Sequence, residues 1–202
     1  MSANRSRNRH SSGFTLIELI MFIVIMGVGL AGILSVMNFT VLHSADPVVR
    51  KQMLAIAEAL MEEVSAQPFT YCDTTDENAT TAASATVGAG GCKTTLQGLG
   101  PGGTGQTRTG ASSFNNVSDY SGLAAINPAT DISGIHTYAA YSATIGIVTG
   151  DALGGGLPIA PNDATAANLN LLRISVTVTN IASGDSLLLE GYRARHSPNA
   201  VP

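Results

Sequence analysis

The sequence predicts an α+β fold, in which a long N-terminal helix packs on a small C-terminal antiparallel β-sheet. An apolar run from Phe14 to Leu34 contains a single ionisable residue, Glu18. Apolar residues then recur at helical spacing as far as Val64, and strict two-residue alternation appears only after Ile135. A helical period that gives way to a strand period places helices and strands in separate parts of the chain.

Composition limits the size and the class of the protein. The chain has 202 residues and a formal net charge of -4, which leaves enough residues beyond the apolar run for one globular domain. Removing Arg5, Arg7 and Arg9 with a leader makes the remaining chain more acidic, and its few basic residues are scattered. We therefore expect no nucleic-acid partner.

Glu18 requires a partner. A charged side chain well inside a membrane-spanning helix costs roughly 2.5 to 3.5 kcal/mol on insertion scales. If the chain is cut after Gly13, Phe14 becomes the amino terminus, and its ammonium group lies at the same end of the helix as Glu18. That amine can neutralise Glu18 of the same subunit or of the next subunit in a stack.

The segment Gly13-Phe14-Thr15-Leu16-Ile17-Glu18-Leu19-Ile20 resembles the N-terminal motif of type IV pilin-like prepilins, in which a basic leader ends in Gly before Phe-Thr-Leu-Ile-Glu and an apolar helix. The resemblance implies that a membrane-embedded prepilin peptidase cleaves between Gly13 and Phe14 and methylates the new amino terminus of Phe14. It also implies that Glu18 aids assembly into a filament. The implied partners are other pilin subunits, the prepilin peptidase, the inner-membrane pilus assembly machinery and, before assembly, membrane lipid.

The apolar run has two other interpretations. A secretory signal would be cleaved after the run, near Ala31, Gly32 and Ser35, but this leaves Glu18 unexplained. A plain single-pass anchor from Leu19 to Leu34 falls slightly short of the roughly 20 residues that span a bilayer.

Charge predicts the orientation in the membrane. The leader arginines precede the apolar run, whereas Arg50 and Lys51 lie well after it, so the positive-inside rule keeps the leader in the cytoplasm. We expect a single-pass inner-membrane protein with its C-terminal domain in the periplasm. The resemblance implies that the subunit then moves into an extracellular pilus.

The predicted helix has a transmembrane and assembly half, residues 14–42, and an amphipathic half, residues 43–67. A fresh helix could start at Ser44-Ala45-Asp46-Pro47, which reads as an N-cap followed by proline. Basic residues after Pro47 and acidic residues before Pro68 oppose the helix dipole, so we expect a kinked continuation that Pro68 ends. The apolar stripe of the second half consists of Val49, Met53, Ile56, Leu60 and Val64.

Three glycines interrupt the membrane half. Gly27, Gly29 and Gly32 each cost about 1 kcal/mol relative to alanine in a helix interior. They favour a soft section that loses regularity on assembly, as the resemblance suggests, or close packing between membrane helices, and the two are compatible.

Residues 68–134 are rich in Gly, Thr and Ala and predict a loop-rich insertion. Cys72 and Cys92 are the two cysteines, and in an oxidising compartment we expect a disulfide worth roughly 3 kcal/mol. Without a nearby histidine they form an incomplete metal-ligand set. The acidic segment from Cys72 to Asn78 offers calcium-type oxygen ligands, but its spacing fits no EF-hand loop and favours a solvated turn.

Residues 135–202 predict the antiparallel sheet. Tyr141 to Ile147 alternates apolar and polar residues as a strand does, and Leu172 to Val178 repeats the pattern. A turn at Ala182-Ser183-Gly184-Asp185 leads to Leu187 and Leu189. We expect a hairpin whose apolar face covers the helix stripe.

Catalytic motifs are missing from the sequence. His43, His136 and His196 are far apart, and there is no nucleophile elbow, paired-histidine zinc motif or phosphate-binding loop. We expect no enzymatic activity, no cofactor and no metal. Asp119-Tyr120 could contact a sugar or a neighbouring subunit, or could simply stabilise a turn.

Later segments resemble one subgroup, the D-type minor pilins of mannose-sensitive haemagglutinin-type pili. They are Asp46-Pro47, Ala59-Leu60-Met61-Glu62-Glu63-Val64, Phe114 to Gly122, and Leu189 to Ala194. The resemblance implies a minor pilin. Two alternatives are a pseudopilin of a type II secretion system, and a tip-located binding module whose loop from Cys72 to Asn116 recognises a glycan or a surface.

Overall fold

The computed structural model describes residues 13–43, 47–150, 152–153, 157–158 and 164–201. The chain divides into two compact units, Met1–Pro47 and Val48–Pro202. The first contains the apolar helix, and the second contains a helix, a three-stranded sheet and long loops. Together these elements give the α+β, pilin-like fold that the sequence predicts.

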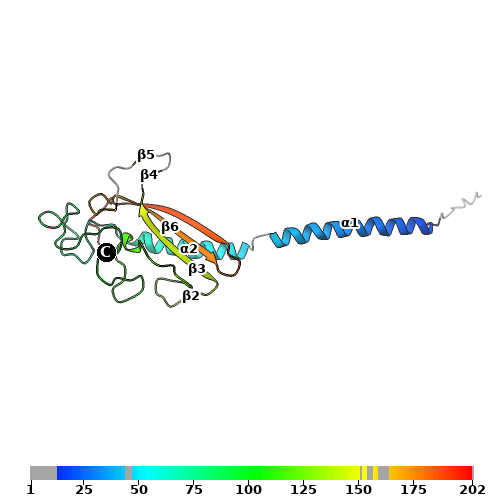
Figure 1. Cartoon of the computed structure of the whole chain (residues 1–202), viewed down its shortest axis with the longest axis horizontal. Helices are drawn as coiled ribbons and strands as arrows, with labels where there is room; N and C mark the ends of the chain where they lie inside the picture. The colour runs from blue at the N-terminus through cyan, green and yellow to red at the C-terminus, as the bar shows by residue number, and fades with distance from the viewer. Residues whose placement is uncertain (1–12, 44–46, 151, 154–156, 159–163, 202) are drawn as a thin grey trace, which may run out of the picture. The chain divides into compact units, whose positions relative to one another are not determined.

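In the described residues of the first unit, the regular structure is the helix α1, Leu16–His43 (Figure 1). Its apolar residues are spread around the whole helix and its few polar residues do not gather on one side, so it lacks the polar face of a helix that lies on a protein surface. Gly27, Gly29 and Gly32 lie within it without ending it.

The second unit begins with α2, Pro47–Ala66. Proline suits a first helical position because its missing N–H has no partner there in any helix. The predicted kink falls on residues 44–46, outside the described residues. As predicted, α2 ends before Pro68, because the residue preceding a proline is disfavoured in helical conformation.

The apolar stripe of α2 is confirmed. Four of its five predicted members are buried, a fifth buried residue, Ala57, lies on the same face, and Val49 packs against the core at half-burial. Burying side chains of this size stabilises by about 1.5 to 3 kcal/mol each. The buried residues of α2 are Met53, Ile56, Ala57, Leu60 and Val64.

The sheet consists of β3 (Tyr141–Thr149), β6 (Leu171–Asn180) and β7 (Ser186–Ala194), in the order β3-β6-β7. Both pairings are antiparallel, and Val176 of the central strand lies opposite Ile145 on one side and Leu189 on the other. The predicted hairpin is therefore confirmed, with its turn after Asn180.

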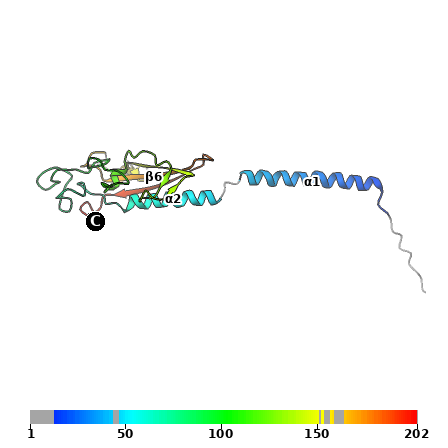
Figure 2. The ribbon, with the colours of Figure 1, turned by 90° about the horizontal axis from the view of Figure 1, so that it is seen from below.

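The core lies between α2 and the sheet, and α2 runs along one sheet face in both views (Figures 1 and 2). The alternating residues of β3 and β6 turn inward, and an added Cβ on Gly191 of β7 would lie 3.3 Å from the sulfur of Met61. A larger residue at Gly191 would therefore press on α2. The inward residues of the two strands include Ala143, Ile145, Ile147, Ile174, Val176 and Val178.

The remaining elements are short. A 3₁₀ helix, η1, spans Val117–Tyr120, and two-residue strands pair as β1 (Ala129–Thr130) with β2 (Thr137–Tyr138). A further pair, β4 (Ala152–Leu153) and β5 (Leu157–Pro158), lies in the loop before β6. Within the second unit, the loops gather beyond the C-terminal end of α2 (Figure 1).

Candidate functional site

The N-terminal motif lies at the start of α1, where Gly13, Phe14 and Thr15 precede the first helical residue. The carbonyl of Thr15 accepts hydrogen bonds from the N–H groups of Glu18 and Leu19, at 3.1 and 3.2 Å. The Thr15 hydroxyl also accepts from the Glu18 N–H, at 3.4 Å. Thr15 thus acts as an N-cap, and the Gly13–Phe14 bond lies in non-helical backbone immediately before a capped helix. The leader arginines lie outside the described residues.

Glu18 occupies the first turn of α1. This position places its carboxylate at the positive end of the helix dipole, which favours the charge without removing its cost in hydrocarbon. The ion pairs found among the described residues do not include Glu18. In the uncut chain the nitrogen of Phe14 is a peptide nitrogen, so the predicted pairing of Glu18 with a free amine stays a prediction.

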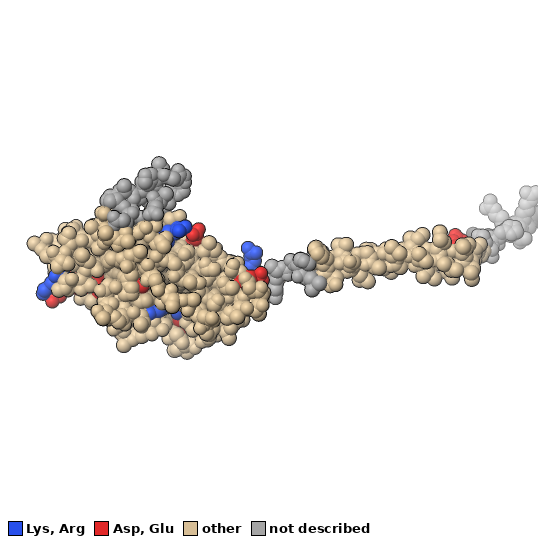
Figure 3. Space-filling view, viewed as in Figure 1, with Lys and Arg blue, Asp and Glu red and all other residues tan. Residues whose placement is uncertain are grey.

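From Leu16 to Phe39 the surface of α1 is apolar apart from Glu18 and a few neutral polar residues, and the described chain leaves it uncovered. The large apolar side chains from Phe14 to Phe39 are 47% to 83% exposed. Residues Leu16–Phe39 form a 24-residue stretch with a mean hydropathy of 2.7, long enough to span a membrane. Figure 3 shows the helix as an uncharged surface apart from one acidic patch near its start. Such a surface is stable in lipid or against other apolar helices.

The three glycines of α1 face open space. A Cβ added at Gly27, Gly29 or Gly32 would meet no atom within 4 Å. The described chain therefore gives them no close-packing role of its own. Packing against another helix and local softening both stay predictions.

A disulfide joins Cys72 and Cys92 in the loop region, as predicted. Both cysteines are fully buried and pack with Ala79 and Ala82 in a small second core. Residues 198–201 cross back over this ring: the Tyr71 N–H donates to the Pro198 carbonyl at 3.2 Å, and the Asn199 amide donates to the Ala82 carbonyl at 2.9 Å. Val201 packs against the same small core.

Asp76 organises the backbone of the disulfide ring. Its carboxylate accepts four backbone N–H groups, from Asn78, Lys93, Thr94 and Thr95, at 2.8 to 2.9 Å. Burial acts to raise the pKa of Asp76, but these hydrogen bonds outweigh it and hold the pKa well below its ordinary value. The ionised carboxylate therefore ties the first part of the ring to the segment that follows Cys92.

The carboxylates of the acidic turn do not converge on one point. Asp73 accepts from the Thr75 N–H at 2.8 Å and from the Gln106 amide at 3.2 Å, whereas Glu77 pairs with Lys93 at the surface. Among the described residues, no group of three His, Cys, Asp or Glu side chains could hold a metal ion. The turn is thus a network of hydrogen bonds within the loop, and not the freely solvated turn that the sequence favoured.

Asp119 and Tyr120 are 0% and 1% exposed, so of the two alternatives the structure favours the stabilised turn over contact with a sugar or another subunit. Asp119 accepts the N–H groups of Asn115 and Asn116, both at 2.9 Å, and closes a capping box at the start of η1. Burial raises its pKa despite these hydrogen bonds. The Tyr120 hydroxyl donates to Glu63 at 2.9 Å, and burial followed by the charge of Glu63 raises the pKa of Tyr120.

Sequence reasoning missed a buried ion pair between Glu63 and Arg108. The guanidinium donates to both carboxylate oxygens, at 2.8 and 2.6 Å, and also to the side chain and carbonyl of Thr130. The two charged side chains are only 5% and 6% exposed. The sequence does contain one signal for such a pair: Glu63 lies beside the apolar stripe of α2, where burying a carboxylate without a partner would cost free energy.

The histidines are not brought together. His136 pairs with Asp131 at 2.6 Å, and hydrogen bonds from Ser133 and His136 lower the pKa of Asp131 to about 2. His196 lies on the tail after β7. The side chain of His43 lies outside the described residues.

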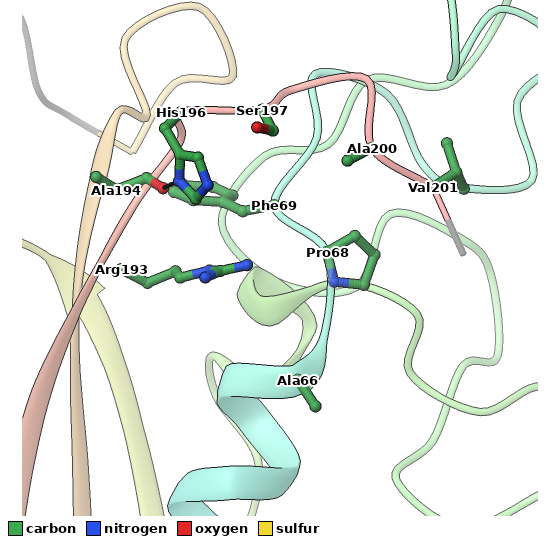
Figure 4. Close-up of a pocket in the computed structure, with 9 residues that line it drawn as sticks. All are labelled: Ala66, Pro68, Phe69, Arg193, Ala194, His196, Ser197, Ala200 and Val201. Carbon is green, nitrogen blue, oxygen red and sulfur yellow. Dashed lines mark hydrogen bonds between the residues drawn. The ribbon is translucent and has the colours of Figure 1, made fainter.

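A cavity of about 380 Å³ lies where α2 ends. Figure 4 shows Arg193 reaching into it from β7, toward Pro68, with His196 and Ser197 on another wall. The Arg193 Nε is buried without a hydrogen-bond partner. The Arg193 guanidinium lies at the negative end of the α2 dipole, and the last turn of α2 has no basic residue of its own. His196 and Ser197 make no hydrogen bond to each other in the described structure, so they form no nucleophile and base pair.

Residues 8–34 match the family described as the prokaryotic N-terminal methylation motif. No curated protein and no solved structure matches the chain. The matched stretch includes Gly13, Phe14 and Glu18 and supports a type IV pilin-like prepilin, either a pilin or a pseudopilin subunit.

Proposed function

We propose that this chain is a minor pilin, a non-catalytic structural subunit of a type IV pilus of the mannose-sensitive haemagglutinin type. One observation supports the proposal: the methylation motif, residues 8–34, spans the start of a capped helix whose surface from Leu16 to Phe39 is apolar and uncovered apart from Glu18. A subunit with such a helix can reside in the inner membrane and later exchange lipid for neighbouring helices. Its C-terminal domain occupies the periplasm before assembly and the surface of the extracellular filament afterwards.

Assembly follows from the chemistry of α1. Lipid tails and apolar side chains are similar solvents for α1, so the transfer from membrane to filament depends on packing and on polar contacts. Glu18 supplies the polar contact: its carboxylate meets the Phe14 ammonium that cleavage after Gly13 releases. An ion pair in an apolar surrounding is costly when misaligned, which fixes the register of adjacent helices.

Intact mass spectrometry of the native protein tests the proposal. We expect a chain that begins at Phe14 and carries one extra methyl group. A Gly13→Leu variant should keep its leader, whereas Gly29→Ala, a change inside α1, should be processed normally. A native chain that retains Arg5 to Arg9, or one trimmed near Ser35, would contradict the proposal.

A second experiment tests the role of Glu18. Glu18→Ala should be processed and remain in the membrane, but its amount in sheared filaments should fall at least tenfold. Asp185→Ala, which removes an exposed carboxylate outside α1, is the control and should assemble normally. Normal amounts of the Glu18 variant would contradict the assembly role. Deletion of the gene separates pilus from pseudopilus: we expect loss of pili with protein export intact.

A further inference from the structure

Arg193 is a partly buried cation that the described part of the chain leaves without a partner. Arg108 and Arg173 form ion pairs with acids, and Arg195 donates to three oxygen atoms just before β6. The Arg193 Nε is buried, and no hydrogen bond or ion pair among the described residues includes the Arg193 guanidinium. A buried polar group without a partner costs free energy, and such a group is expected where a ligand completes its hydrogen bonds.

The Arg193 guanidinium lies in the cavity of about 380 Å³ at the end of α2, and two further polar side chains lie on another wall (Figure 4). The His196 Nδ1 is 3.2 Å from the Ala194 carbonyl, which can only accept, so Nδ1 carries the proton and Nε2 is left free within the described structure. The Ser197 hydroxyl also has no partner among the described residues. The other described lining residues are apolar, and none is acidic.

These groups define the chemistry of a ligand. The Nε–H and one Nη–H of a guanidinium form a fork that fits both oxygens of a carboxylate. Arg193 is the one arginine or lysine of the described lining and lies at the negative end of the α2 dipole, so the cavity favours a single negative charge over the double charge of a phosphate. The Ser197 hydroxyl and the His196 Nε2 can each bond a hydroxyl group of the ligand. Apolar walls with a few polar groups are typical of small-molecule sites of this size.

We propose that this cavity binds an acidic monosaccharide, such as a hexuronic acid, either free or at the end of a glycan. The carboxylate of the sugar pairs with the Arg193 guanidinium, and its hydroxyl groups bond Ser197 and His196. The C–H groups of the sugar ring lie against the apolar walls. The inference goes beyond pilus assembly and does not depend on it, because every residue of the site lies in the second unit.

Binding should also stabilise the segment after β7, which forms one wall of the cavity. This segment is held to the loop region by the hydrogen bond from the Tyr71 N–H to the Pro198 carbonyl, at 3.2 Å. A ligand that contacts both Arg193 of β7 and Ser197 of the segment favours the docked form. Hydrogen exchange at the Tyr71 amide reports on this docking, because the amide is exposed when the segment opens.

Calorimetric titration of the processed full-length protein in detergent micelles tests the ligand chemistry. D-glucuronate is the probe, acetate supplies a carboxylate without ring hydroxyls, and D-glucose supplies hydroxyls without a carboxylate. We expect glucuronate to bind at least tenfold more tightly than acetate, and glucose not to bind. Methyl β-D-glucuronide separates the two sources: equal affinity indicates the end of a glycan and weaker affinity a free acid, and either result supports the site.

Variants assign the binding to the cavity. Arg193→Gln should raise the Kd for glucuronate at least tenfold, and Arg193→Lys, which keeps the charge without the fork, should give an intermediate Kd. Ala200→Phe fills the cavity without changing a charge and should also abolish binding, so the test stands even if Arg193→Gln does not fold. Arg173→Gln removes a surface arginine of β6 and should bind glucuronate as the native protein does.

Hydrogen exchange gives an independent measurement. At ten times its Kd, glucuronate should slow exchange at the Tyr71 amide about tenfold, because a ligand that binds only the docked form lowers the open fraction by 1 + [L]/Kd. The Gly134 amide, which donates to Asp131 in a turn that does not line the cavity, should be unaffected. Arg193→Gln should show no response at Tyr71.

Three results would overturn the proposal. They are no binding of glucuronate, equal binding of glucose and glucuronate, and an unchanged Kd in both Arg193→Gln and Ala200→Phe. Bound glucuronate that leaves the exchange of the Tyr71 amide unchanged would overturn the bridging position of the ligand between β7 and the segment.

Discussion

Glu63 and Arg108 form a two-pronged ion pair inside the second unit, although 45 residues separate them in the sequence. Each side chain is almost completely buried, and Tyr120 and Thr130 satisfy further hydrogen bonds of the pair. The pair ties the loop region to the helix that carries the core. It thus connects a segment with almost no regular structure to the most regular part of the unit.

Removing one partner of this pair should be strongly destabilising. We expect Arg108→Gln to lower the free energy of unfolding by about 3 to 5 kcal/mol, because it leaves the Glu63 charge buried and unpaired. Urea unfolding of the detergent-solubilised chain, followed by circular dichroism, measures the change. Arg173→Gln is the matched control, since Arg173 pairs with Glu190 at the surface and should cost about 1 kcal/mol or less. Equal effects of the two variants would contradict the assigned role.

The lowered pKa of Asp76 predicts that the stability of the folded chain falls at low pH. Its pKa is lowered in the folded chain, so its contribution is present above the unfolded value of about 3.9 and is lost as the pH falls below that value toward the folded pKa. We expect the melting temperature of the oxidised protein to fall more steeply below about pH 4 than that of Asp76→Asn. The variant should be the less stable of the two at pH 7. Parallel profiles for both proteins would show that the carboxylate does not organise the ring.

The two faces of α2 should respond differently to the same truncation. Leu60 is 3% exposed and Leu54 is 38% exposed on the same helix. We expect Leu60→Ala to cost about 2 to 5 kcal/mol through lost burial and a residual cavity. Leu54→Ala should cost less than half as much. Comparable losses in urea unfolding would mean that the core does not lie where the structure places it.

Charge reversal on the exposed face of α2 should raise stability. Glu58 and Glu62 are exposed in the C-terminal half of the helix, whose last turn has no basic residue. Replacing both by lysine puts cations near the negative end of the helix, which typically contributes about 0.3 to 1 kcal/mol per charge. We therefore expect the double variant to melt at a higher temperature than the native chain at low ionic strength, as followed by circular dichroism. A lower melting temperature of the variant would contradict this prediction.

The regular elements could be predicted because each has a local signal. The apolar stripe of α2 and the alternation in β3 and β6 are periods within one segment, and each fixes which face is buried. The disulfide followed from two cysteines and an oxidising compartment. Pro68 marked the end of α2 because its effect on the preceding residue is local.

The loop region could not be predicted in the same way. Asp76 is held by N–H groups of residues 93–95, and Arg108 by Glu63, so the contacts that decide the structure join distant segments without any period. The sequence left two interpretations of Asp119 and Tyr120 open, because polar residues in a loop usually face water and only the fold shows that these two are buried. Here hydrogen bonds from other loop residues take the place of water.

The segment that crosses the disulfide ring, residues 198–201, sets an order in which this part of the chain is completed. Cys72 and Cys92 are synthesised well before it, so the covalent bond can form while the ring is still uncovered. Once the segment docks on Tyr71 and Ala82, it covers the small core that contains both sulfurs. A reductant from solvent then reaches the disulfide only when this segment detaches.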